Sequence, residues 1–412
     1  MTTKRERTSL RALLLAAVAL TLASASQADF SGTDLINPID AGTGTASPLD
    51  SGTPLVPGFY PNVELDYGYD DNVKRAESNT RDSTFAHLMP DLRWVGAFGK
   101  HVVRVGYLGG YAKYFDEPDE NYMDHYLGAD VKLDLTQKLD VNAGVGFRRG
   151  HETRFQTTGN DGADPNVWNQ WNAKLEAVYG RRIATAQIGA AYEHTDRKYK
   201  NNGQDIRDYV GDVITLTGYY NLGPRTQLLV EPSYGTYEYL KTDQDNDVVK
   251  ILAGVVWTAT AKTTGKARIG AYNKDFDIEK ALQKDTSGTW VDLEVVWEPK
   301  TYSTVVLRAR RDTKDAALGT GGSYESTLLS AAWEHELTET TELQLGLSYQ
   351  SDNYVEVNRD DDFIGAYIGI SRAITRNMTV GARYDFTQRD SSVINNDFDN
   401  NMITVGLRTT FE

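Results

Sequence analysis

The sequence predicts an all-β fold: a transmembrane, antiparallel, up-and-down β-barrel of about 18 strands, with 16 as the alternative count. Apolar residues alternate with polar or small ones, as in residues 341–350, which read TELQLGLSYQ. A strand with this period of two has one apolar and one polar face. Such segments fill nearly the whole chain from Phe59 onward and are joined by connections that alternate between short and long. A closed barrel lets such strands cross a membrane with every backbone group paired.

The N-terminal segment has the three parts of a secretory signal peptide. Basic residues precede an apolar stretch at 12–23, and Ala28 ends a cleavage site made of small residues. This stretch is shorter than the roughly 20 residues that a spanning helix needs. We therefore expect residues 1–28 to be removed. Residues 29–57 are rich in Gly, Thr, Ser, Asp and Pro without periodicity, which indicates a flexible periplasmic leader, and residues 58–412 are expected to form the barrel.

The composition excludes several classes of protein. The chain has no cysteine, so neither a disulfide framework nor a lipoprotein anchor is expected. The formal charge of -15 makes nucleic acid an unfavourable partner. The sequence is polar on average, but a barrel presents only alternate residues to lipid, so this does not exclude a membrane protein. Abundant glycine (36) and tyrosine (24) with few prolines (11) suit strands that end in interfacial aromatics.

The connections sort into two groups by length and by charge. Most of the short ones contain Lys or Arg, whereas long loops such as 243–247 and 360–362 are acidic. In outer-membrane barrels the short turns face the periplasm, so we expect both termini there and the long loops outside. The short turns are expected at 98–101, 136–140, 180–183, 221–225, 261–266, 298–301, 337–341 and 374–377, and the long loops include 70–83, 154–167, 275–289, 311–323 and 351–361.

Aromatic residues near the strand ends predict two interfacial girdles, because amphipathic rings favour the membrane–water boundary. The girdle near the short turns comprises Phe98, Tyr179, Tyr220, Trp257, Trp297, Trp333 and Phe411. The girdle near the long loops comprises Tyr67, Tyr69, Tyr111, Phe115, Tyr192, Tyr234, Tyr349, Tyr384 and Phe386. The alternative is that these aromatics are scattered through a soluble all-β core. The girdles imply outer-membrane lipid and lipopolysaccharide as partners.

The last strand-like segment alternates from Ile403 to Phe411 and ends in an aromatic. This is similar to the C-terminal signal by which the barrel-assembly machinery recognises its substrates. Such signals usually finish on the aromatic itself, whereas Glu412 follows Phe411 here.

Two short motifs carry a resemblance to a known family. Residues 68–73 read GYDDNV at the end of the first strand, and residues 88–92 read LMPDL in the second. These resemble the opening of the putative β-barrel porin 2 family of outer-membrane proteins, and the similarity runs from about Pro57 to the C-terminus. The resemblance implies a single barrel, often encoded among exopolysaccharide or capsule genes, with a transport role and polysaccharide export components as partners. It implies no catalytic residues.

The parity that faces the lumen carries charges of both signs. Neighbouring strands alternate in sign, so the charges either form ladders that shape the wall or provide a basic track for an anionic solute. Arg308, Arg310, Arg383 and Arg408 are the first candidates for solute contact, and Tyr272 and Tyr367 are placed either to stack on sugar rings or to pack in the wall. The other expected pore-lining residues are Arg104, Lys132, Arg148, Lys174, Lys266, Arg268, Asp130, Asp134, Glu176, Glu193, Glu231, Asp292, Glu294, Glu342 and Asp385.

An outer-membrane hydrolase is the enzymatic alternative, with histidines at 124–125, 150–152, 193–195 and 334–336. Adjacent residues of a strand point to opposite faces, so each pair makes a poor catalytic dyad, and no enzyme is expected.

Residues 243–247 begin like a calcium loop, but Val248 replaces the required glycine and Gly254 the closing glutamate. A calcium loop of this type is therefore excluded, and no metal site or cofactor is expected. Loose bridging of divalent ions between the acidic loops and anionic surface lipid is the alternative. The sequence favours a transport pore for polysaccharide or other charged hydrophilic solutes, against a plugged structural or adhesive surface barrel.

Overall fold

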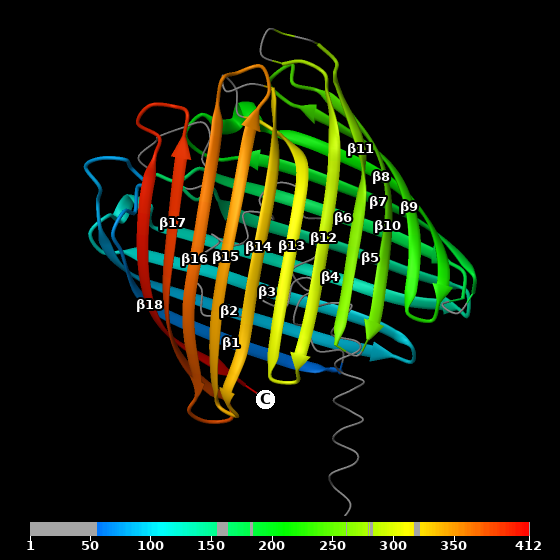
Figure 1. The fold of residues 1–412 in the computed structure, drawn as a ribbon, viewed down its shortest axis with the longest axis horizontal. Coiled ribbons are helices and arrows are strands. Elements are labelled where there is room, and N and C mark those ends of the chain that lie inside the picture. The colour runs from blue at the N-terminus through cyan, green and yellow to red at the C-terminus, as the bar shows by residue number, and fades with distance from the viewer. Residues whose placement is uncertain are drawn as a thin grey trace, which may run out of the picture.

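A computed structural model describes residues 56–154, 164–181, 184–260, 262–278, 280, 283–316 and 322–411, with the side chains of 258–260 left aside. One antiparallel sheet of 18 strands closes on itself, because β1 pairs with both β2 and β18 (Figure 1). The predicted fold and the larger of the two strand counts are therefore confirmed. The predicted signal peptide and nearly all of the leader lie outside the described residues, so both stay predictions.

The strands follow one another around the barrel in chain order (Figure 1). They are β1 (Gly58–Asp70), β2 (Ser83–Phe98), β3 (His101–Tyr114), β4 (Tyr122–Thr136), β5 (Leu139–His151), β6 (Val167–Tyr179), β7 (Ala186–Tyr199), β8 (Tyr209–Gly223), β9 (Thr226–Tyr239), β10 (Asn246–Thr260), β11 (Thr263–Phe276), β12 (Thr286–Lys300), β13 (Ser303–Asp315), β14 (Ser323–Thr338), β15 (Thr341–Tyr354), β16 (Asp360–Ala373), β17 (Met378–Ser391) and β18 (Phe398–Thr410). Two short 3-10 helices, η4 (Pro118–Glu120) and η5 (Gln204–Arg207), lie in the long loops.

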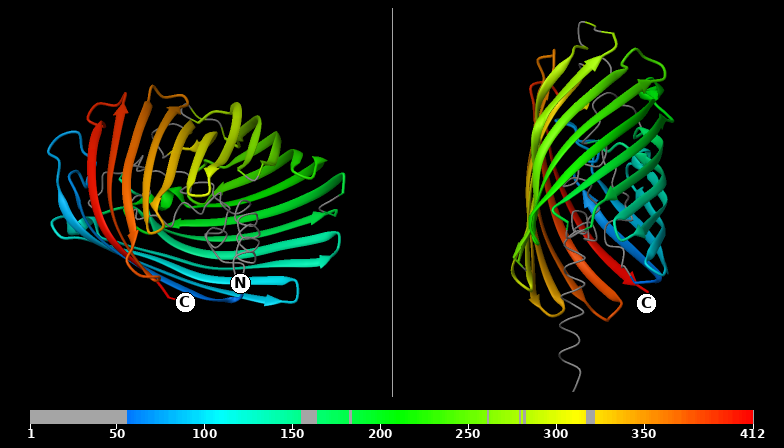
Figure 2. Two further views of the ribbon diagram at one scale, coloured as in Figure 1. Left: turned by 60° about the horizontal axis from the view of Figure 1, so that its bottom comes forward. Right: turned by 90° about the vertical axis from the view of Figure 1, so that its right-hand side faces the viewer.

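Closure of the barrel removes the free sheet edges. The pairing of β1 with β18 runs in register from Asn62 opposite Thr410 to Asp70 opposite Met402. Unpaired edge groups are costly in hydrocarbon, so this seam is a condition for membrane insertion. Figure 2 shows a wall that is broad in one view and narrow in the other, so the barrel has a flattened cross-section. The flattening brings opposite walls toward each other.

The short connections confirm their predicted positions, and they all lie at the end of the barrel where β1 begins and β18 ends. At the other end, the strand bounds confirm the long loop predicted at 70–83, and the connection predicted at 154–167 begins directly after His151. The loops predicted at 275–289, 311–323 and 351–361 are shorter than predicted. β11 continues to Phe276, β13 to Asp315 and β15 to Tyr354, and the acidic residues 360–362 begin β16 instead of lying in a loop. The reason is that backbone pairing continues above the membrane, where both faces of a strand are polar and the alternating pattern fades.

The two faces of the wall differ in polarity. Large apolar side chains are exposed on the outer face, for example Leu347 at 65% and Ile269 at 60%. Polar side chains occupy the inner face, where Asn400 and Asp66 are almost fully buried. This is the reverse of a soluble sandwich, in which the apolar face is the buried one. None of the helices among the described residues is long and apolar enough to cross a membrane.

The predicted girdle near the short turns lies at one end of the outer face. Phe98, Tyr179, Tyr220, Trp297 and Phe411 are 48–61% exposed, and Trp257 and Trp333 are partly exposed. At the long-loop end, four outer-face tyrosines donate their hydroxyl to an aspartate on an adjacent strand or in the loop before it. The pairs are Tyr69 with Asp82, Tyr192 with Asp212, Tyr234 with Asp247 and Tyr349 with Asp362. Each ring therefore has an apolar body and a polar tip, which suits a membrane boundary.

Candidate functional site: the lumen and its long-loop cavity

Charged side chains on the inner face form a ladder of ion pairs across β11, β12 and β13. Arg268 lies 2.9 Å from Glu231 and also binds Asp292, which accepts a second contact from Lys266 at 3.2 Å. One step further round, Arg308 lies 2.9 Å from Glu294. Residues directly opposite each other in neighbouring strands share a face, which is why the alternating signs meet here. The lumen wall is thus strongly charged but largely compensated.

The four arginines expected to contact solute are each held by a carboxylate of the wall. Their partners are Glu294 for Arg308, Asp312 for Arg310 at 2.6 Å, Asp385 for Arg383 at 2.8 Å and Glu64 for Arg408 at 2.9 Å. A solute anion would have to compete with these carboxylates. Solute contact by these residues therefore stays a prediction.

Some of the remaining expected lumen residues are buried in the barrel wall, and others are exposed on its inner face. Tyr367 is buried, with the Arg383 guanidinium 3.9 Å from its ring centroid, and its ring lies against Gly346, where a Cβ atom would collide with it. Tyr272 is also buried and donates its hydroxyl to Glu325 at 3.1 Å. Both tyrosines therefore pack against the wall, and stacking on sugar rings stays a prediction for both. Lys174 pairs with Glu193 at 3.2 Å, and Lys132 is exposed on the same face as Arg104.

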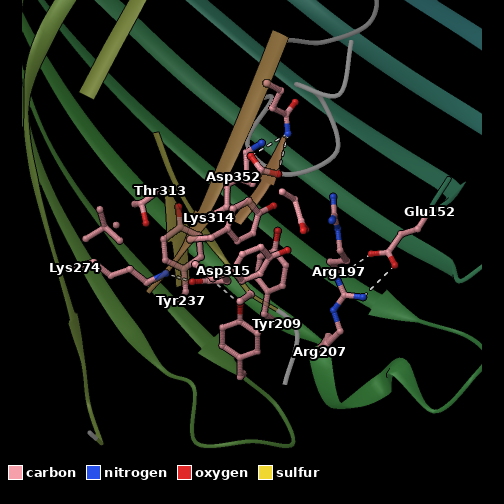
Figure 3. A pocket seen from close by; sticks show the side chains of 18 of the residues that line it. Glu152, Arg197, Arg207, Tyr209, Tyr237, Lys274, Thr313, Lys314, Asp315 and Asp352 are labelled. Atoms are coloured by element: carbon pink, nitrogen blue, oxygen red, sulfur yellow. Dashed lines mark hydrogen bonds and ion pairs between the residues drawn. The ribbon is translucent and has the colours of Figure 1, made fainter. Parts of the chain in front are cut away.

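A cavity of about 220 Å³ lies inside the barrel at the long-loop end (Figure 3). Its lining comes from β5 to β17, so it spans the lumen from one wall to the other. Side chains of strands that are not neighbours meet in it, since the hydroxyl of Tyr239 on β9 donates to Asp315 on β13 at 2.6 Å. The cavity is rich in rings and charges. It is lined by nine aromatic side chains: Trp168, Tyr199, Tyr209, Tyr237, Tyr239, Trp290, Tyr324, Tyr354 and Phe363.

The loop between β7 and β8 directs Arg207 into this cavity (Figure 3). Gly203, with φ +66°, permits the left-handed turn from which η5 begins. Arg207 lies 2.8 Å from Glu152, which follows β5 directly, and Glu152 also accepts bonds from Tyr199 at 2.7 Å and Asn166 at 2.9 Å. Burial alone would raise the pKa of Glu152, but Arg207 and these hydrogen bonds lower it below the ordinary 4.5. Glu152 is therefore held as a carboxylate.

Cations in the cavity lie over ring faces. Arg197 lies 4.4 Å from the ring centroid of Trp168, Lys250 lies 4.1 Å from that of Trp290, and Lys314 lies 6.0 Å from that of Tyr324. Among the described residues no carboxylate lies within 4.0 Å of the ammonium group of Lys250 or of Lys314. These two lysines had the inner parity in the sequence but were not selected there. The alternating pattern alone indicated that both lysines face the lumen.

The structure joins two of the histidine motifs that were considered for hydrolysis. His151 on β5 lies 2.9 Å from Asp124 on β4, while His125 points to the other face and bonds Tyr107 at 2.8 Å. Neither Asp124 nor His151 bonds a serine or threonine hydroxyl within the described part of the chain. His194 pairs with Asp212 on the outer face. His335 lies against Tyr302 and Trp333 near a short turn. Among the described residues, the Asp124–His151 pair therefore has a base and an orienting group but no hydrogen-bonded serine or threonine hydroxyl.

The acidic segment at 243–247 does not converge on a point. Asp243 pairs with Lys280 at 3.0 Å, Asp245 accepts the backbone N–H of Tyr239, and Asp247 accepts the hydroxyl of Tyr234. Across the described ranges, no group of three or more His, Asp or Glu residues is arranged to hold a metal ion.

Comparison with known families decides the class of this barrel. The model of the family described as "Putative beta-barrel porin 2" matches residues 58–411. The chain belongs to this family. Membership of the beta-barrel porin 2 family agrees with the resemblance found at residues 68–73 and 88–92. It also agrees with the single barrel that this resemblance implies. It places the protein in the outer membrane of a Gram-negative bacterium, with the fold of a porin-like channel.

Solved barrels with a similar fold are distant in sequence. OccK2 (OpdF) of Pseudomonas aeruginosa is 11% identical, with 86% of this chain and 98% of that chain covered at a TM-score of 0.48. A BenF-like porin of Pseudomonas fluorescens Pf-5 is 11% identical, with 87% and 100% covered at 0.47. The siderophore receptor PiuA of Acinetobacter baumannii is 9% identical, with 88% and 83% covered at 0.46. No curated protein matches this sequence.

Proposed function

We propose that this beta-barrel porin 2 protein is a channel that passes small charged hydrophilic solutes across the outer membrane. The observation that supports this best is the inner face of the closed 18-stranded wall, with its ladder of ion pairs around Arg268 and Glu294. Side chains alone fill barrels of about eight strands, whereas 16 to 18 strands leave an aqueous passage. A charged and compensated wall keeps such a passage wet without fixing one sign of solute.

The orientation belongs to the same proposal. The long-loop end faces the outside, and the short turns and both termini face the periplasm, because outer-membrane barrels have this asymmetry of loop length. The proposed partners are lipid and lipopolysaccharide at the girdles and the barrel-assembly machinery at the 403–411 face. Polysaccharide export components complete this set, and a polysaccharide is one candidate solute.

Conductance in planar bilayers tests the channel. Purified full-length protein is expected to give discrete current steps. In the variant Arg308→Ala with Arg310→Ala, Glu294 and Asp312 lose their partners, so the reversal potential in a salt gradient should shift toward cation selectivity. A barrel that inserts, migrates as folded protein and stays silent at all voltages would contradict the proposal.

The second candidate is a plugged surface barrel, and the narrowing at the long-loop end favours it. Tyr239 on β9 bonds Asp315 on β13 inside the lumen, and the ion pair of Glu152 with Arg207 holds a loop there. Under this alternative no current steps appear in the unaltered protein. Steps that appear only after Tyr239→Phe with Arg207→Ala would support the plugged form.

A further inference from the structure

The long-loop cavity reverses the charge balance of the molecule. The chain carries 58 acidic and 43 basic residues, so an average surface is acidic. The cavity is instead lined by seven cationic side chains, Arg197, Arg207, Lys250, Lys274, Lys314, Arg359 and Arg389, against the four carboxylates of Glu152, Asp315, Asp352 and Asp361. An enclosed space with an excess of cations attracts an anion, and its low dielectric strengthens that attraction.

Some of these cations are already neutralised. Glu152 holds Arg207, Asp315 holds Lys274, and Asp361 holds Arg359 at 2.6 Å. Lys250 and Lys314 are the lysines of the lining with no ion pair to a described residue, and each is steadied by an aromatic ring. Asp352 acts on Lys314, and Glu231 and Asp312 act on Lys250, only from beyond ion-pair distance. Two ammonium groups in one cavity, each over a ring and without a direct carboxylate contact, are suited to a carboxylate.

The aromatic lining adds a preference for shape. The indole of Trp290 lies beneath Lys250, and Tyr324 stacks on Tyr354 with ring centroids 5.0 Å apart. Flat ring faces bind the faces of other rings, and a cavity of about 220 Å³ is smaller than the roughly 300–1,000 Å³ of drug-sized ligand sites. The space therefore suits one ring at a time.

We propose that the long-loop cavity binds a small ring-bearing carboxylate. Its carboxylate lies on the ammonium groups of Lys250 and Lys314 and its ring lies against the aromatic lining. This inference rests on the proposed channel, since the cavity lies inside the lumen and a passing solute would meet it. Sugar acids and aromatic acids share this chemistry, so glucuronate and benzoate are the two probes.

Tryptophan fluorescence of the detergent-solubilised full-length protein measures binding directly, because Trp168 and Trp290 line the cavity. Glucuronate, benzoate or both should give saturable changes. Tighter binding of glucuronate would identify the ligand as a sugar acid, and tighter binding of benzoate would identify it as an aromatic acid. Glucose, which lacks the carboxylate, and acetate, which lacks the ring, should bind about 10-fold more weakly or worse, as loss of a charged hydrogen bond or a stacked ring implies. Equal responses to all four probes would overturn the inference.

Lysine variants assign the site. Lys250→Met and Lys314→Met should each weaken binding about 10-fold or more, since each removes a charge-assisted contact. Lys113→Met is the matched control, because Lys113 also lies over an aromatic ring, 5.5 Å from the ring centroid of Phe115, but lies outside the cavity. It should bind as the unaltered protein does. Lys250→Gln and Lys314→Gln serve if a Met variant fails to fold. Unchanged binding in the folded variants of both positions would refute the inference.

The same protein in planar bilayers separates the two proposals. Glucuronate or benzoate should reduce the open-channel current in a saturable manner, and Lys250→Met should shift the half-blocking concentration in the same direction as the binding constant. A conducting barrel without saturable binding contradicts the cavity inference and leaves the channel intact. A barrel that binds the probe but never conducts contradicts the channel instead.

Discussion

The carboxylate of Glu152, directly after β5, lies 2.8 Å from the guanidinium of Arg207 in η5. This contact joins two long loops that lie 55 residues apart in the chain, and it does so inside the lumen. Both side chains are largely buried, with 9% and 18% of their surface exposed. The pair therefore fixes the shape of the long-loop cavity.

Replacement of Glu152 by Gln should destabilise the folded barrel by about 3 kcal/mol, because a buried arginine is left without its partner. The midpoint of urea unfolding in lipid vesicles measures this. Asp205→Asn in the same loop is the control. Its pair with Lys241 is solvent-exposed, so the midpoint should hardly move. Equal midpoints for Glu152→Gln and the unaltered protein would show that the buried pair is not a structural tie.

Low pH should weaken the contact between Glu152 and Arg207 that joins the two long loops. The folded-state pKa of Glu152 lies below the ordinary 4.5. A lowered pKa means that the stabilisation is fully present above the unfolded value and is lost as the pH falls through the folded value. Hydrogen exchange of residues 200–208 should therefore quicken below about pH 4.5, and Glu152→Gln should show fast exchange already at neutral pH. A loop whose protection is the same at pH 4 and pH 7 would argue against this pair as its clamp.

Asp66 should tolerate loss of its charge. It is 1% exposed on the inner face, and neither carboxylate oxygen has a hydrogen-bond partner among the described residues. A buried charge without a partner is costly, so Asp66→Asn should stabilise the barrel by about 1 kcal/mol or more at pH 8. Asp385→Asn should instead destabilise it, because Asp385 holds the buried Arg383. Urea midpoints that move the opposite way in either variant would contradict this reading.

The outer face should reject charge in the middle of a strand. Leu347 is 65% exposed halfway along β15, where the wall would meet hydrocarbon. Leu347→Arg should cost about 2–4 kcal/mol, the range for arginine at the bilayer midplane. Ser348→Arg, one residue on and facing the lumen, should cost less than about 1 kcal/mol. If Ser348→Arg proves the more damaging of the two, the assignment of faces is wrong.

The sequence was sufficient for features that depend on neighbouring strands. A period of two fixes which residues share a face, and turn lengths fix which strands are adjacent, so the meeting of Arg268 with Asp292 follows from the alternation alone. The positions of the short turns likewise followed from where the alternating segments end. The family resemblance at 68–73 and 88–92 agreed with this independent reading, and the match over 58–411 supports both.

The cavity depended on relationships that no local pattern contains. Tyr239 and Asp315 lie on strands that are not neighbours, so no pairing pattern predicts their contact. Arg207 and Glu152 lie in loops without periodicity, where chain direction is set by turns such as that at Gly203. Lys250 had the correct parity, but only the structure shows that the carboxylates nearby pair with other cations.

Cysteine scanning along β11 tests the central claim, a sealed wall with lipid on one face and a water-filled lumen on the other. The chain has no cysteine of its own, so single replacements at 266–269 report without background. In outer-membrane vesicles, a water-soluble maleimide should label positions 266 and 268, whose side chains face the lumen, and should leave 267 and 269 unlabelled while a lipid-soluble maleimide labels them. Equal labelling by the water-soluble reagent at all four positions, or its complete exclusion from 266 and 268, would contradict the account.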